Sequence, residues 1–200
     1  NEVAPEFKEI DDRVERLADN DPSFESVVAR RPGLVAVQFV WHVGPEGIVA
    51  TRTQFHDVGI PTYVLPADCL DKDNTVGVDG TRSELFSTAS IHQGVRELAH
   101  IFDIQDRGDE LVADLVAREE AAIERARALD LEDVSAVFWF SSADMNTDPF
   151  VAGQKGAPAY MMEQLGIRNV VESDEEWPIV GWETIARANP TLIVIAEMDR

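Results

Sequence analysis

Residues 24–37 read FESVVARRPGLVAV, and residues 182–195 read WETIARANPTLIVI. In both stretches an aromatic residue, a glutamate and a Ser or Thr come first, and a proline and an apolar run follow at the same spacing. The copies begin 158 residues apart (182 − 24 = 158), whereas solenoid repeats have periods of roughly 20 to 50 residues. The repeat therefore predicts two lobes of similar build, in each of which a short helix leads into a strand. Two such α/β lobes with a cleft between them suit a binding protein.

Composition narrows the class of protein. The chain has 200 residues, of which 44% are hydrophobic, so it can form the core of one large domain or of two small lobes. Its formal net charge of −21 argues against nucleic acid and anionic membrane surfaces as partners. No run of about 18 apolar residues is present, so we expect no direct membrane insertion of this chain, and a lipid anchor upstream is left open. The single cysteine, Cys69, rules out an internal disulfide and a thiolate-based zinc site.

A βαβ unit is expected in the first third of the chain. Asp21-Pro22 is the expected N-cap and first turn of the repeat helix, which ends at Pro32-Gly33. The unit itself consists of a strand buried on both faces, a helix closed by a glycine, and a second strand; the residues are Leu34–Val40, Thr51–Val58 with Gly59, and Ile60–Leu65. A crossover connection of this kind is right-handed.

The middle of the chain is predicted to be helical. Residues 66–82 read as a polar loop, and helical spacing follows over Ser83–Phe102 and Asp109–Leu129. The second of these helices would be about 30 Å long at 1.5 Å per residue. A rod of this length between two α/β lobes is typical of a spine that joins them, and an ordinary crossover helix is the alternative.

The last third of the chain repeats the α/β pattern. The expected order is a buried strand, a long loop, a helix with a glycine C-cap, a short strand, a loop and the second repeat: Val134–Phe140, 141–153, Ala157–Leu165 with Gly166, Asn169–Val171, Glu172–Val180 and 182–195. The predicted fold class is therefore α/β, with two Rossmann-like lobes joined by a long spine helix and a ligand cleft between the lobes. The expected segments are an N-terminal lobe (1–82), a helical segment with the spine (83–130) and a C-terminal lobe (131–200).

Sequence signatures of catalysis are not found. The chain has no GxSxG, HExxH, P-loop or GxGxxG motif. The pair Glu175-Glu176 lies in a polar stretch and is expected to be solvated rather than to act as a general acid and base. Residues 153–156, GQKG, precede a helix and are interpreted as a plain turn in preference to an anion site at the helix N-terminus. We therefore expect no enzyme activity, no resident metal and no cofactor.

Aromatic side chains gather at the ends of the predicted strands and in nearby loops. Because ligands of open α/β sheets bind beyond the carboxyl ends of the strands, the residues there are candidates for ligand binding. Aromatic faces bind flat or greasy ligands, and Trp adds a polar N–H group and cation–π capacity; core packing is the alternative for each residue. The candidates from both expected lobes are Trp41, His42, Met145, Phe150 and Trp177.

Several segments resemble the helical-backbone (class III) substrate-binding proteins of ABC importers, in the branch that carries iron–siderophore complexes, haem and cobalamin. The resemblance covers most of the chain, and Asp109–Leu129 falls where that family has its interdomain spine. It implies that a further βα unit precedes residue 1 and that more strands follow residue 200. The segments that carry it occur in the order of the family: Ser23–Val35, Gly59–Pro61, Pro149–Gly153 and Glu176–Val194.

The resemblance also implies roles for single residues. Glu25 and Glu183 match the two glutamates, one per lobe, that dock onto arginines of the membrane permease. An exposed carboxylate at a helix start can receive a bidentate Arg, and a purely local interaction with the helix dipole is the alternative. Trp177 and Phe150 match positions that line the ligand cleft, and strict spacing in the first lobe gives Gln38 as the matching position there.

The predicted function is that of an extracytoplasmic solute-binding protein, either in the periplasm or lipid-anchored at the cell surface. It would capture a metal chelate, with a ferric siderophore as the favoured ligand, and deliver it to the permease of an ABC importer. Two alternatives stay open: a binding protein for a non-metal organic cofactor, and a two-lobed α/β enzyme or metallochaperone.

Overall fold

The structure, a computed structural model, describes residues 4–76, 79–129, 133–144 and 146–196. Contacts between residues divide the chain into two compact units, Asn1–Val64 and Leu65–Arg200. Both units combine helices with parallel strands, so the predicted mixed α/β class is confirmed. The segment boundary that we expected at residue 82 lies inside the second unit.

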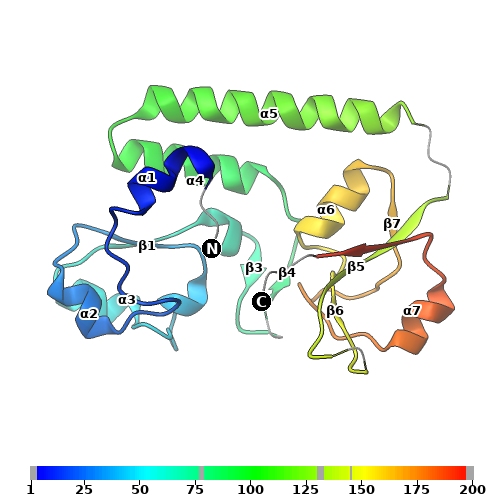
Figure 1. Cartoon of the computed structure of the whole chain (residues 1–200), viewed down its shortest axis with the longest axis horizontal. Helices are drawn as coiled ribbons and strands as arrows, with labels where there is room; N and C mark the ends of the chain where they lie inside the picture. Colours follow the sequence, from blue (N-terminus) through cyan, green and yellow to red (C-terminus); the bar gives the residue numbers. More distant parts are fainter. Residues whose placement is uncertain (1–3, 77–78, 130–132, 145, 197–200) are drawn as a thin grey trace. The chain divides into compact units, whose positions relative to one another are not determined.

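The first unit contains a small parallel βαβ unit (Figure 1, blue to cyan). Strand β1 pairs with β2, with Val35 opposite Thr62. Helix α3 lies between these strands in the sequence, as predicted. The elements in chain order are η1 (Pro5–Phe7), α1 (Lys8–Asp11), α2 (Phe24–Ala29), β1 (Val35–Val37), η2 (Val40–His42), α3 (Arg52–Asp57) and β2 (Thr62–Val64).

The core of the first unit is centred on Phe55, whose side chain is fully buried. The ring of Phe24 in α2 packs edge to face against it, with the ring centroids 5.1 Å apart. Burying a side chain of this size contributes about 1.5–3 kcal/mol, so this contact fixes α2 against α3. The other fully or nearly fully buried members of the core are Val43, Ala50 and Ile60.

Local signals set the helix ends in the first unit. Thr51 begins α3 with a complete capping box, in which its side chain accepts the backbone N–H of Gln54 and the Gln54 side chain accepts the backbone N–H of Thr51. Gly59 follows α3 with a φ of +78°, the left-handed conformation that glycine adopts without steric cost. Helix α2 is capped by Ser23 rather than by Asp21, because the Ser23 side chain accepts a backbone N–H of the first turn; the predicted cap was wrong.

The strand predicted at Leu34–Val40 is shorter and less buried than expected. Strand β1 covers only Val35–Val37, and its side chains are half-buried or exposed. The chain then enters the 3-10 turn η2 at Val40. Within the described residues β1 has a single partner strand, so it lacks the flanking strands that bury a central parallel strand on both faces.

The second unit is built around strand β5 (Figure 1, green to red). Helices and strands alternate after a long helical hairpin. The elements in chain order are η3 (Pro66–Asp68), β3 (Lys72–Asp73), β4 (Thr81–Arg82), α4 (Ala89–Ile101), α5 (Gln105–Arg127), β5 (Ser135–Ser141), β6 (Phe150–Val151), α6 (Ala157–Gln164), β7 (Arg168–Asn169), α7 (Trp182–Ala188) and β8 (Leu192–Ile195).

Strand β5 pairs with three other strands. Strands β7 and β8 run parallel to it, and β6 pairs antiparallel with its C-terminal end. Strand β6 lies in the stretch predicted as the loop 141–153, and the β3–β4 hairpin lies in the stretch predicted as the loop 66–82, so both loops were wrong in part. Two-residue strands leave almost no periodic pattern in a sequence. The buried core beside β5 consists of Val137, Val151, Val171 and Ile185.

The two copies of the sequence repeat have the same local structure. In each copy a helix of the first half leads into a strand of the second half, α2 into β1 and α7 into β8. The residue before the shared proline is left-handed in both copies, with φ of 48° at Arg31 and 47° at Asn189. A left-handed residue ends a helix, and proline cannot continue it. The repeat therefore encodes a helix–turn–strand unit, as predicted.

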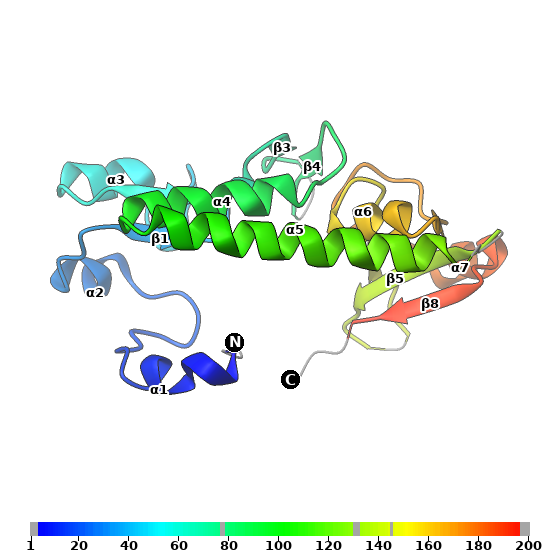
Figure 2. The same ribbon diagram turned by 90° about the horizontal axis from the view of Figure 1, so that it is seen from above.

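Helices α4 and α5 lie side by side in the second unit (Figures 1 and 2). Helix α5, Gln105–Arg127, is the long helix predicted at Asp109–Leu129. The two helices approach closely at Gly108, where an added Cβ atom would lie 2.4 Å from the Cβ atom of Ala99. No helix in the four described ranges combines the length and apolar character needed to cross a membrane.

Glu119 ties α5 to two other helices of the second unit. Its carboxylate accepts a hydrogen bond from the Thr88 hydroxyl at the start of α4 (2.9 Å) and another from the Tyr160 hydroxyl of α6 (2.7 Å). Burial raises the pKa of Tyr160, and the hydrogen bond to Glu119 raises that pKa further. The phenol therefore stays a donor to Glu119 at neutral pH.

Replacing Gly108 by Ala is expected to lower the free energy of unfolding by about 1–3 kcal/mol, because the added methyl group would overlap Ala99. The sign of the effect is informative, since Gly to Ala in a helix without such a contact stabilises by roughly 0.5–1 kcal/mol. Urea unfolding followed by far-UV circular dichroism measures the change. Gly33→Ala is the control, because an added Cβ there meets nothing within 4 Å. A more stable Gly108→Ala variant would contradict the close approach of α4 and α5.

Candidate functional site

An aromatic cluster lies on one face of β5 in the second unit. The Trp177 ring stacks on Phe140, with centroids 4.5 Å apart and an interplanar angle of 29°. It lies 6.3 Å from the ring of Phe138 in a tilted arrangement. Because Phe138 and Phe140 are two residues apart in a strand, both point to the same face. All three side chains are half-buried, so this Trp177 cluster (Phe138, Phe140 and Trp177) retains accessible aromatic surface.

The neighbouring residue Trp139, which is half-buried, points to the other face of β5 and packs on Trp182. Its ring meets that of Trp182 edge to face at 4.9 Å. The indole nitrogen of Trp182 donates a hydrogen bond to the carbonyl oxygen of Thr147 (3.1 Å), whereas the buried Nε1 of Trp139 has no partner among the described residues. These two rings pack against each other, and a ligand contact is not needed to explain them.

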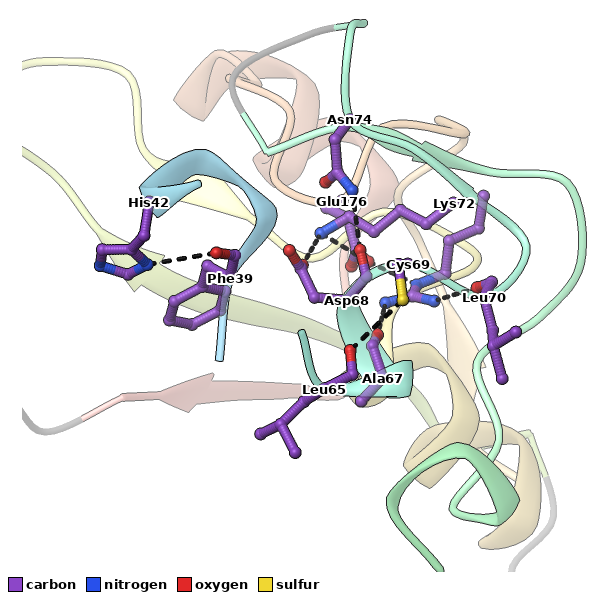
Figure 3. Close-up of polar contacts among 11 residues, drawn as sticks. Phe39, His42, Leu65, Ala67, Asp68, Cys69, Leu70, Lys72, Asn74 and Glu176 are labelled. Carbon is purple, nitrogen blue, oxygen red and sulfur yellow. Dashed lines mark hydrogen bonds and ion pairs between the residues drawn. The ribbon is translucent and has the colours of Figure 1, made fainter. Parts of the chain in front are cut away.

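A second aromatic group, in the first unit, contains two of the predicted ligand residues. Trp41 is 54% exposed, and its indole N–H donates to Nε2 of His42 at 3.2 Å. The Phe39 ring lies 5.0 Å from the Trp41 ring. Nδ1 of His42 is 3.2 Å from the Phe39 carbonyl oxygen (Figure 3), and Nε2 is 3.4 Å from Asp21. His42 therefore anchors an exposed tryptophan rather than presenting a free imidazole.

The remaining predicted ligand residues occupy different places. Gln38 is exposed and directly follows β1. Phe150 is half-buried in β6 and forms an antiparallel bridge with Ile179, two residues beyond Trp177, so Phe150 and Trp177 come from adjacent backbone segments. Met145 lies outside the described residues.

A buried network of four charged side chains includes Glu176, the residue before Trp177. Three of the four, Asp68, Lys72 and Glu176, are labelled in Figure 3. Nε of Arg82 donates to Oε1 of Glu176 at 2.5 Å. Nζ of Lys72 lies 3.8 Å from the same oxygen and 2.6 Å from Oδ1 of Asp68. These side chains are only 7–9% exposed. Two positive and two negative charges thus balance one another at a buried place.

Glu176 was expected to be solvated, and that interpretation was wrong. Its partner Arg82 is 94 residues away in the sequence, so no local pattern connects the two. Arg82 also donates to the carbonyl oxygens of Ala67 (2.8 Å) and Leu70 (3.3 Å), which leaves its guanidinium well satisfied. The available signal was weak: Lys72 and Arg82 are basic residues in an acidic chain. Burial raises the pKa of nearby Asp79, an effect that the charge of Lys72 partly offsets.

The glycines of GQKG allow this loop to pack closely. A Cβ atom on Gly156 would lie 2.4 Å from Oε2 of Glu176, and one on Gly153 would lie 1.9 Å from the carbonyl oxygen of Glu175. Gly156 is the N-cap of α6, so the carboxylate next to this helix start belongs to Glu176 of the chain itself. Lys155 pairs with Asp174 at 3.1 Å.

The two glutamates assigned to permease docking occupy equivalent places in the repeat. Glu25 lies in the first turn of α2, and Glu183 lies in the first turn of α7. Both are exposed, and neither forms an ion pair with another described residue. Their carboxylates are therefore available to an external cation.

The described part of the chain holds no group of three or more His, Cys, Asp or Glu side chains placed to bind a metal ion. Its chemistry is that of aromatic faces beside a neutralised charge network. Such a site can bind a ligand by stacking, and it offers few free cations for an anionic ligand.

Replacing Arg82 by Met is expected to lower the free energy of unfolding by about 3–5 kcal/mol, because it leaves the Glu176 charge buried without its main partner. Urea unfolding measures the loss. Lys155→Met is the matched control: its partner Asp174 has a side chain that is 64% exposed, and such pairs contribute at most about 1 kcal/mol. Similar small effects of both variants would indicate that Glu176 is solvated after all.

Comparison with known proteins places this geometry in a family. The family model described as periplasmic binding protein matches residues 2–200. The molybdate-binding protein MolA of Haemophilus influenzae is 26% identical over 185 residues, which cover 89% of this chain and 48% of that protein. A periplasmic binding protein of Veillonella parvula has a TM-score of 0.76 at 22% identity, covering 98% of this chain and 60% of that one.

The vitamin B12 binding protein BtuF of Vibrio cholerae is similar in fold, with a TM-score of 0.66 at 16% identity, covering 96% of this chain and 64% of that protein. The chain spans about half the length of the curated relative and less than two thirds of these solved structures. The match to the family model nevertheless extends over residues 2–200, a range that contains both copies of the repeat. The chain belongs to the periplasmic binding protein family.

Proposed function

We propose that this chain is the ligand-capturing part of an extracytoplasmic solute-binding protein that delivers a metal chelate, with a ferric siderophore as the favoured ligand, to the permease of an ABC importer. Membership of the periplasmic binding protein family supports the role in solute capture. The observation that carries the choice of ligand class is the stacked aromatic surface of Trp177 and Phe140.

Aromatic faces favour a ligand with flat, polarisable groups. A half-buried indole stacked on a phenyl ring offers its remaining edge and face to such groups. Trp41, in the first unit, offers a second aromatic face and is 54% exposed. Aryl or conjugated groups of a chelate can stack on such a surface, and a few polar contacts then set specificity.

The distribution of cations argues for stacking rather than charge as the main source of affinity. Arg52, a cation near the first-unit strands, donates to the Thr62 hydroxyl at 3.0 Å. Lys155 is paired with Asp174, and Arg82 and Lys72 form ion pairs within the buried network. With a net charge of −21, the chain would repel a strongly anionic ligand that brought no aromatic contact.

The named ligands of relatives supply the competing candidates. Proteins of similar fold are named for binding haem and vitamin B12, and both compounds have the flat conjugated rings that aromatic surfaces recognise, so a large organic cofactor is the second candidate. The relative MolA is named for molybdate. A small oxyanion is held by N–H donors rather than by stacking, and the aromatic cluster therefore favours the larger ligands.

Isothermal titration calorimetry of the full-length protein with a ferric catecholate siderophore, a ferric hydroxamate siderophore, haem, cyanocobalamin and molybdate tests the proposal. We expect saturable binding of a ferric siderophore with a Kd of about 1 μM or below, equivalent to roughly −8 kcal/mol. Trp41→Ala is expected to weaken that binding about fivefold to tenfold, the worth of one aromatic contact.

Phe102→Ala is the matched control for Trp41→Ala. Phe102 is an exposed aromatic residue, 65% exposed, at the end of α4, and it is not a predicted ligand residue. Its removal should leave the Kd unchanged. Tight binding of haem or cobalamin alone would replace the siderophore by the second candidate, and tight binding of molybdate alone would refute the stacking argument.

The docking role of Glu25 and Glu183 is a separate proposal that rests on their exposure and equivalent placement. Each carboxylate lies at a helix start and can accept a bidentate pair of hydrogen bonds from a permease arginine. Contacts from two lobes would let the permease respond to the pair rather than to either glutamate alone.

Replacing Glu25 and Glu183 together by Ala is expected to abolish uptake of radiolabelled ligand by cells that carry the native importer, while the Kd measured by calorimetry stays unchanged. The double variant Glu120→Ala and Glu172→Ala removes the same charge from exposed sites outside the repeat helices and should transport normally. If the first double variant lost ligand affinity instead, or if both double variants transported normally, the docking assignment would be wrong.

A further inference from the structure

We propose that Arg82 and Glu176 form a positioning pair that holds Trp177 in the orientation in which it stacks on Phe140. Ligand affinity would then depend on a buried ion pair that acts through the adjacent tryptophan. The effect on affinity rests on the proposed function, whereas the effect on the orientation of Trp177 can be tested without any ligand.

The backbone on either side of Trp177 is attached to two different segments. The backbone N–H of Glu176 donates to the carbonyl oxygen of Gly80 (3.0 Å), and the backbone N–H of Val151 donates to the carbonyl oxygen of Pro178 (3.0 Å). The carbonyl oxygen of Glu176 also accepts a hydrogen bond from the backbone N–H of Gly153 (3.1 Å). Trp177 therefore lies between two residues whose backbones are both bonded to neighbouring segments. Its ring direction depends on how firmly these two neighbours are held.

The Glu176 side chain supplies the stronger of these attachments. A charge-assisted hydrogen bond is roughly twice as strong as a neutral one, and removing one partner of a buried ion pair leaves an unpaired buried charge. Glu176 is buried with Arg82, and Lys72 lies 3.8 Å from the same carboxylate oxygen. The carboxylate thus adds a charged attachment to the two backbone hydrogen bonds that hold Glu176, the residue before Trp177.

Arg82 can act as a fixed anchor because its other nitrogens are also bonded. Two of them donate to the carbonyl oxygens of Ala67 and Leu70, and its guanidinium lies 5.3 Å from the centre of the Phe86 ring, a cation–π contact. A guanidinium held at three places cannot follow a moving carboxylate. The position of the Trp177 loop therefore depends on the positions of η3 and the β3–β4 hairpin, the segments that hold Arg82.

Near-UV circular dichroism of the ligand-free, full-length protein tests the positioning. The difference between the wild-type spectrum and that of Trp177→Phe isolates the signal of the stacked indole. The decisive variant is the double substitution Arg82→Met and Glu176→Met, because removing both charges avoids an unpaired buried ion and such replacements are often neutral for stability. We expect this variant to retain its far-UV spectrum and to lose at least about half of the Trp177 signal, since an unstacked ring no longer senses its neighbour.

For the ligand that the wild type binds, the same double variant is expected to raise the Kd about fivefold to tenfold, the worth of one aromatic contact. Tyr160→Phe is the matched control. It removes the half-buried 2.7 Å hydrogen bond to Glu119 in the same unit and leaves the Trp177 loop untouched. Its stability should fall, whereas its Trp177 signal and its Kd should stay at wild-type values.

The outcomes separate two claims, that the ion pair positions Trp177 and that this positioning affects ligand affinity. An unchanged Trp177 signal in the folded double variant would overturn the positioning role. A lost signal with an unchanged Kd would overturn the effect on affinity. If no compound binds the wild type, the proposed function fails, and the spectra still decide the positioning. Should the double variant fail to fold, Glu176→Gln keeps the shape and removes the charge; a smaller loss of the Trp177 signal supports the proposal and an unchanged signal refutes it.

Discussion

The ion pair between Arg82 and Glu176 joins two segments of the second unit that are 94 residues apart in the sequence. Removing both charges from water is costly, and such a pair adds stability only when its remaining donors and acceptors are satisfied. Here Arg82 reaches two carbonyl oxygens, and Lys72 and Asp68 complete a neutral group. The contact brings the Trp177 loop next to the β3–β4 hairpin, and Gly156 leaves room for the Glu176 carboxylate beside the start of α6.

Strand β5 divides the aromatic residues of the second unit according to the period of a strand. Phe138 and Phe140 point to the face where Trp177 stacks, and Trp139 points to the face that packs on Trp182. One short sequence, read with period two, therefore supplies both the face proposed for ligand binding and a face that packs within the unit. The helices of the second unit are held separately, through Gly108 and through the two hydrogen bonds accepted by Glu119.

The proline and the glutamate of the repeat have different roles. The proline and the left-handed residue before it end the helix, and this local chemistry is the same at Arg31 and at Asn189. The glutamate in the first turn of each repeat helix takes no part in the fold contacts described for the chain, so it is free to serve a partner. A family that needs two equivalent contacts with a permease can obtain them from one duplicated helix start, which is the role proposed for Glu25 and Glu183.

The sequence alone determined the mixed α/β class, the parallel βαβ unit, the long helix α5 and the family. These features depend on hydrophobic periodicity, on caps such as Thr51 and on the order of motifs, all of which can be read directly along the chain. Only the tertiary structure decided that Glu176 is buried, that a hairpin lies within residues 66–82, and that Leu34–Val40 contains a strand of three residues. The reason is physical: a charge pair across 94 residues, a two-residue strand and the number of neighbours beside a strand are properties of contacts distant in sequence, and no local window of residues contains them.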